Sequence, residues 1–175
     1  MISLARINLL EVVVAHLRTL RKLGQPGINI GDLLFFFGLP ALFALPLAYF
    51  FGDRLYDQAS KLLTAVSLMG GFLFNLLART SQIVEKARKE ANQGSVRRIF
   101  AKEIHSNVAF GIILSLSCSI TLVVFSFMEK PTAKQWESQL GLAWMGYFLL
   151  VAFFLTLLMI VKRMFIILNS DVEDL

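Results

Sequence analysis

Four long apolar stretches divide the chain, and each is bounded by polar or charged residues. They run over Leu33–Phe51, Leu62–Ala78, Val108–Met128 and Leu140–Val161, and none of them contains Lys, Arg, Asp, Glu or His. A helix needs about 20 apolar residues to cross the hydrocarbon core of a bilayer. Lipid offers no partner to an unpaired backbone group, so each stretch should be helical and no sheet is expected. The pattern predicts an all-α membrane protein with four transmembrane helices.

The composition supports a membrane location. Hydrophobic residues make up 57% of the 175 positions and charged residues 17%, against roughly 45–50% and 25% in soluble domains. A small soluble protein cannot bury such a surplus, because small domains bury only part of their surface. The composition therefore excludes an ordinary soluble domain.

The positive charges predict the orientation. The N-terminal segment, the 79–107 connection and the C-terminus hold thirteen of the seventeen Lys and Arg residues, whereas the two other connections, 52–61 and 129–139, hold four. Basic residues favour the cytoplasmic side of a membrane. We therefore expect a multi-pass membrane protein with both termini in the cytoplasm.

Residues 1–24 predict an amphipathic helix on the cytoplasmic face. Asn8, Glu11 and Arg18 share one side of the helical wheel, while leucines and valines fill much of the rest. Gly24 to Gly27, with Pro26 between them, should end the helix. It either lies on the membrane surface or packs against the other helices. Residues 31–175 then form the four-span transmembrane domain.

The connection 79–107 predicts a cytoplasmic helical hairpin. Residues 80–91 contain no Gly or Pro, Glu85 and Lys89 form an i,i+4 pair of opposite charge, and Gly94 with Ser95 marks the turn. Several basic residues are left without an internal counter-charge, and two of these lie at a helix start, where backbone amides also attract anions. The candidate ligands of a phosphate-bearing molecule are Arg88, Arg97, Arg98 and Lys102. The alternative is that these charges only set the topology and contact anionic lipids.

Small and polar residues follow one face of the second stretch and recur every four residues in the third. Neutral hydroxyls and amides can replace water around an ion, so the candidate pore-lining residues are Ser67, Gly71, Asn75, Ser115 and Ser119. Thr64 shares the face of Ser67. The alternative is that the small residues serve close helix packing.

The sequence offers little material for catalysis. No ionisable residue lies at membrane depth, which argues against a proton-coupled transporter. Cys118 is alone, His16 and His105 are the only histidines, and no nucleophile, phosphate-binding loop or metal-ligand spacing is present. We expect neither an enzyme nor a protein that needs a metal or cofactor.

The run from Leu62 to Leu77, with its Gly70-Gly71-Phe72-Leu73-Phe74-Asn75 centre, followed by a charged helix, resembles small membrane effectors of bacterial anti-phage defence. Its size and layout are similar to those of the membrane partner in the Hailong system. The resemblance implies a homo-oligomeric ion channel that halts growth when it is released. It also implies gating by a nucleic-acid signal made by a partner nucleotidyltransferase.

The leading hypothesis is a homo-oligomeric, ligand-gated channel effector, for instance a tetramer. Its hairpin would receive a nucleic acid, a nucleotide or a soluble partner from the same operon. Opening would depolarise the membrane and arrest growth, as in abortive infection. One alternative is a membrane anchor or scaffold that recruits a soluble partner and conducts nothing. Another is a holin-like lesion former.

Overall fold

The computed structural model describes residues 9–20, 30–89, 95–131 and 136–173, and within these it is helical and contains no strand. Of the helical residues 32, 83, 86–89, 95–101, 136–138 and 167–173 it describes the backbone alone. In chain order the elements are α1 (Leu9–Thr19), α2 (Ile30–Leu33), the π-helical turn η2 (Leu34–Gly38), α3 (Leu39–Lys89), α4 (Ser95–Phe127) and α5 (Trp136–Glu173).

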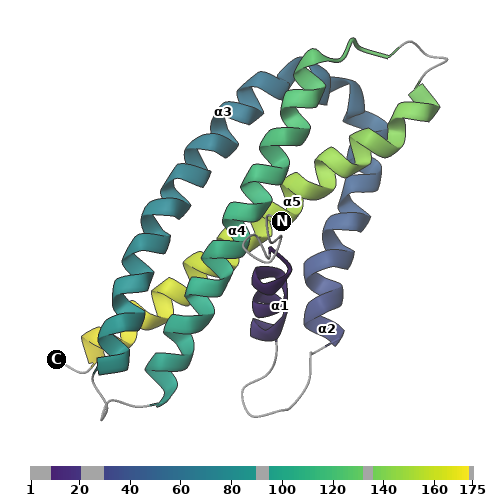
Figure 1. Cartoon of the computed structure of the whole chain (residues 1–175). Helices are drawn as coiled ribbons and strands as arrows, with labels where there is room; N and C mark the ends of the chain where they lie inside the picture. Colours follow the sequence, from purple (N-terminus) through teal and green to yellow (C-terminus); the bar gives the residue numbers. More distant parts are fainter. Residues whose placement is uncertain (1–8, 21–29, 90–94, 132–135, 174–175) are drawn as a thin grey trace, which may run out of the picture.

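The first two apolar stretches belong to one bent helix. A straight helix of 51 residues would be about 75 Å long, but the ribbon of α3 rises on one side of the molecule, turns near the top of Figure 1 and descends on the other side. The connection predicted at 52–61 is therefore helical rather than a loop. Its residues explain this, because after Gly52 it contains no Gly or Pro and holds the helix formers Arg, Leu, Gln, Ala and Lys.

Among the described residues, three helices are long and apolar enough to cross a membrane, where the sequence pattern predicted four. The spanning candidates run over Leu34–Gln82, Lys102–Phe127 and Gln139–Ile166, and the first of them holds both N-terminal apolar stretches. Large apolar side chains cover the outside of these helices, among them Phe50, Leu68, Phe127 and Phe165, each more than half exposed. Such a surface suits lipid rather than water.

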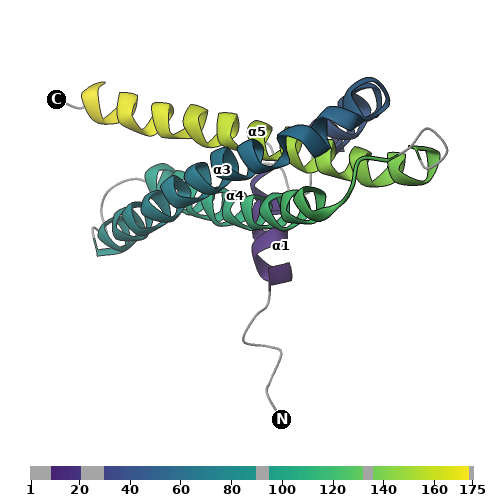
Figure 2. The ribbon, with the colours of Figure 1, turned by 90° about the horizontal axis from the view of Figure 1, so that it is seen from above.

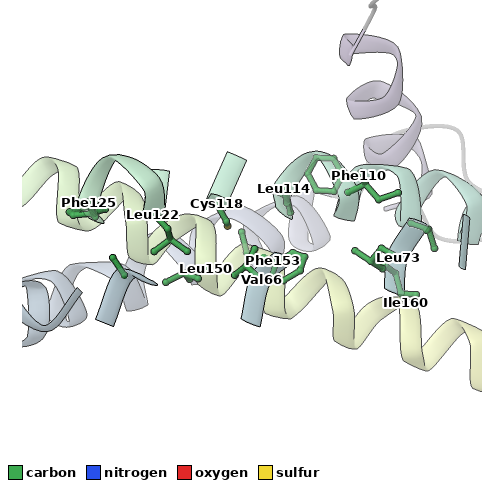
Figure 3. Packing of buried hydrophobic residues seen from close by; sticks show 14 of the residues in the cluster. Val66, Leu73, Phe110, Leu114, Cys118, Leu122, Phe125, Leu150, Phe153 and Ile160 are labelled. Carbon is green, nitrogen blue, oxygen red and sulfur yellow. The ribbon is translucent and has the colours of Figure 1, made fainter. Parts of the chain in front are cut away.

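Helix α4 lies at the centre of the packing and contacts α1, α3 and α5. The core between the three long helices is continuous along α4 (Figure 3). Its labelled members are Val66, Leu73, Phe110, Leu114, Cys118, Leu122, Phe125, Leu150, Phe153 and Ile160, all buried. Two glycines allow the close approach: a Cβ on Gly111 would lie 3.1 Å from Leu73 Cδ1, and one on Gly146 would lie 2.8 Å from Leu55 Cδ2.

Helix α1 crosses the long helices instead of running beside them. Viewed from above, it projects out of the layer formed by α3, α4 and α5 (Figure 2). Its inner side contacts α4, with His16 and Thr19 buried, while Leu9 and Leu10 on its outer side stay exposed. Helix α1 therefore packs against α4, and its exposed outer side is left available to the membrane surface.

Candidate functional site

A row of small and uncharged polar residues runs along the exposed side of α3. Thr64, Ser67, Gly71 and Asn75 are all exposed, and their spacing places them on one face of the helix, as the sequence pattern predicted. The space beside Gly71 is open, because nothing lies within 4 Å of the position a Cβ would take. This row, which we call the polar stripe, is uncovered within one copy of the chain.

Two side chains of the polar stripe donate hydrogen bonds to the backbone of their own helix. Thr64 Oγ1 donates to the carbonyl of Ser60 at 3.0 Å, and Asn75 Nδ2 donates to the carbonyl of Gly71 at 3.4 Å. Oxygen atoms therefore remain available on the outer side. Ser60 and Gln82 are also exposed and continue the same face at its two ends. The face from Ser60 to Gln82 is about 33 Å long, which matches the thickness of a bilayer's hydrocarbon core.

The two candidates from the third apolar stretch lie elsewhere. Ser115 is buried, donates to the carbonyl of Ile112 at 2.9 Å, and faces Gly70, whose Cβ would lie 2.8 Å from its Oγ. Ser119 is half-buried on the same helix. Ser115 thus allows α3 and α4 to approach closely, and the structure does not bring Ser115 together with the polar stripe.

A buried polar junction holds α1 to α4. His16 Nδ1 lies 2.8 Å from Asn107 Oδ1, and Thr19 Oγ1 lies 2.8 Å both from that oxygen and from the His16 carbonyl. The imidazole also stacks on Phe110, with ring centroids 3.8 Å apart and planes within 7°. His16 and Asn107 are fully buried. Buried polar groups that are paired in this way fix one arrangement of helices, because any other leaves them unpaired.

Arg163 extends the junction to α5. Its Nη1 donates to Glu103 Oε2 on α4 at 2.9 Å, and its Nη2 donates to the carbonyl of Thr19 at 2.9 Å. That carbonyl is at the C-terminal end of α1, where helix carbonyls lack internal partners and a cation is favoured. One guanidinium therefore joins the end of α1 to both α4 and α5.

Burial shapes the chemistry of His16. Removal from water lowers the pKa of its imidazole from 6.5 to about 4, an effect that the hydrogen bond to Asn107 opposes in part and the positive Arg163 reinforces. His16 is therefore neutral at pH 7. Its Nε2 and the Nδ2 of Asn107 find no partner in the part of the chain that the structure describes. One signal of this junction is visible in the sequence, because His16 interrupts an otherwise apolar side of the first helix.

The opposite end of the bundle is held by polar contacts to α3. Lys130, after α4, lies 2.8 Å from Asp57 and 3.5 Å from Asp53, and the hydrogen bond to Asp57 raises the pKa of the Lys130 ammonium. On α5, Tyr147 donates to the carbonyl of Phe51 at 2.7 Å, and Gln139 accepts from Tyr56.

The candidate anion ligands lie on two helices that approach the same connection. The backbone of Arg88 belongs to the end of α3, and the backbones of Arg97 and Arg98 belong to the first turn of α4. Their side chains, and residues 90–94 of the predicted hairpin, are outside the described residues. Lys102 on α4 is exposed. Within the described residues no group of His, Cys, Asp and Glu could hold a metal ion.

Comparisons with models of protein families, with curated proteins and with solved structures find no match to this chain.

Proposed function

We propose that this chain is a homo-oligomeric ion channel of a bacterial inner membrane whose conducting path is lined by the polar stripe of α3. The observation that carries the proposal is that Thr64, Ser67, Gly71 and Asn75 are exposed on the stretch 62–78 of α3, whose other exposed residues are apolar. An amide facing hydrocarbon is costly, and polar residues in membrane helices face a neighbouring helix or water. Several copies arranged around an axis, for instance four, would give each stripe such a place.

One copy cannot form the path alone. The space between α3, α4 and α5 is filled by the packed core, including Phe125 and Phe153, which are fully buried. The oxygens of the polar stripe point away from this core. In an assembly they would surround ions with neutral acceptors, as selectivity filters and pores do.

The proposal includes a four-span topology. The two arms of bent α3 would each cross the bilayer, with Asp53, Arg54 and Asp57 at the turn between them on the outer side. Both termini and the 79–107 hairpin would then be cytoplasmic, in line with the distribution of Lys and Arg. Helix α1 crosses the long helices, so it would lie in the plane of the cytoplasmic interface with Leu9 and Leu10 towards the lipid.

The resemblance to anti-phage membrane effectors suggests the physiological role. The hairpin would receive a phosphate-rich signal, a nucleic acid or a nucleotide, or a soluble partner protein, and opening would depolarise the membrane and arrest growth. Arg88, Arg97, Arg98 and Lys102 are the proposed ligands, because the N-terminal amides of α4 add to the attraction of its first arginines. An oligonucleotide touching several subunits would gain affinity from multivalency.

Substitution of Asn75 tests the path. Asn75→Leu should lower single-channel conductance in planar bilayers severalfold, because it replaces a polar group of the path by an apolar one, while the size of the detergent-solubilised oligomer stays unchanged. Phe72→Leu is the matched control, since Phe72 is exposed on α3 outside the stripe and should conduct normally. Wild-type protein that assembles but conducts nothing would instead support the anchor or scaffold alternative.

Binding to membrane vesicles tests both whether the hairpin binds nucleic acid and on which side of the membrane it lies. Inside-out vesicles should retain short oligonucleotides at low salt and right-side-out vesicles should not. Binding should weaken steeply with salt, because each neutralised phosphate releases counterions. The double variant Arg97→Glu, Arg98→Glu should lose binding but still assemble, whereas Lys162→Glu should bind as the wild type does. Equal retention by both vesicle orientations would contradict the proposed topology, and retention by neither would remove nucleic acid as the signal.

A further inference from the structure

The two ends of the polar stripe differ in their balance of charge. Among the described residues at the end near the turn of α3, three acidic and three basic residues balance one another: Asp53, Asp57, Glu129, Arg54, Lys61 and Lys130. Lys130 joins both aspartates, at 3.5 and 2.8 Å. This mouth therefore has no net charge to attract one sign of ion over the other.

The other end of the stripe has an exposed cation. Arg79 follows Asn75 by four residues, so the two side chains are neighbours on the surface of α3. Arg79 is exposed and forms no ion pair with another of the described residues. On α4, the exposed Lys102 lies towards the same end of the bundle, and Glu103 there is occupied by Arg163 at 2.9 Å. Glu85 on α3 offsets one of the two charges of Arg79 and Lys102, so a net positive charge is left at this mouth.

We infer that Arg79 makes the channel prefer anions. The inference rests on the proposed path along the polar stripe, which has no charge of its own between Lys61 and Arg79. In an assembly, each copy would add one guanidinium to a ring at the cytoplasmic mouth. A ring of fixed positive charge raises the local concentration of anions and repels cations, and such rings select anions in known pores.

Permeability ratios measure this preference directly. Purified protein in planar bilayers, bathed in unequal KCl solutions, should show a chloride-to-potassium permeability ratio above one. Arg79→Gln should reduce the ratio at least about fivefold, because one unit charge at about 4 Å in water changes the local concentration of each ion by about that factor, in opposite directions for chloride and potassium. Arg79→Glu should invert the preference. Lys162→Glu is the matched control, since it makes the same change of charge at the end of α5 on an exposed residue, and should leave the ratio unchanged.

A chemical change of charge keeps the test independent of folding. In a Cys118→Ala background, Arg79→Cys supplies a single accessible thiol. Reaction of the assembled channel with a positively charged methanethiosulfonate should restore anion preference, and reaction with a negatively charged one should favour potassium.

The outcomes separate this inference from the proposed function. A conducting wild type that is unselective or prefers potassium overturns the inference and leaves the channel standing. An anion preference that survives both Arg79→Glu and negative modification of the cysteine also overturns the assignment to Arg79. Absence of any conductance overturns the channel, and the inference with it.

Discussion

Acidification from pH 7 to pH 4 is expected to lower the free energy of unfolding by about 3 kcal/mol through His16 alone. Burial places the pKa of His16 at about 4 in the folded protein, against 6.5 for an exposed histidine. Below pH 6.5 His16 becomes protonated in the unfolded chain but stays neutral in the folded chain. The stability is therefore fully present above pH 6.5 and is lost progressively as the pH falls towards 4.

The measurement is equilibrium unfolding in detergent, followed by circular dichroism at several pH values. His16→Phe is the control, because a phenyl ring can stack on Phe110 but cannot titrate. Carboxylates such as Glu103, which pairs with Arg163, contribute alike to both proteins, so the difference between them isolates His16. Identical pH profiles for the wild type and His16→Phe would show that the imidazole is not buried in a neutral form.

Gly146→Ala should lower the free energy of unfolding by up to about 2 kcal/mol, because overpacking outweighs the better helix propensity of alanine. The new methyl group would lie 2.8 Å from Leu55 Cδ2 and 3.0 Å from Phe125 Cε2. These contacts join α5 to α3 and to α4, so a shift of α5 that relieves one close contact tightens the other.

Gly141→Ala provides the matched comparison on the same helix. Nothing lies within 4 Å of its Cβ position, so alanine there should raise stability by up to about 1 kcal/mol. Buried Cys118 reports unfolding, since its thiol becomes reactive towards a fluorogenic maleimide when the core opens. Similar unfolding temperatures for the two variants would mean that α5 does not pack closely at Gly146.

The helical class and the polar stripe were predictable from the sequence, because both depend on local patterns. Apolar stretches without charges indicate membrane helices, and the spacing of Thr64, Ser67, Gly71 and Asn75 places them on one face of any helix. The continuity of α3 was missed because Asp53, Arg54, Asp57 and Lys61 suggested an aqueous loop. Charges show where a chain meets water, but they do not show whether its backbone stays helical there.

The buried polar junction was not predictable, since it depends on contacts between distant parts of the chain. His16 and Asn107 are separated by 91 residues, and helical periodicity carries no information about which helices meet. The same limit applied to Ser115, whose spacing suits either a path or a close contact. Its burial against Gly70 favours the contact.

The junction also sets an order in which the protein can be completed. Helix α1 leaves the ribosome before the other helices, yet Arg163, which holds its last carbonyl, follows Thr19 by 144 residues. At 5–20 residues per second, synthesis of that interval takes on the order of ten seconds. Asn107 follows Thr19 by 88 residues and is made earlier, so for the last part of this time α1 can pair with α4 but not yet with Arg163. The junction is therefore complete only when α4 and α5 have both been made and lie side by side, which places it late in the assembly of the bundle.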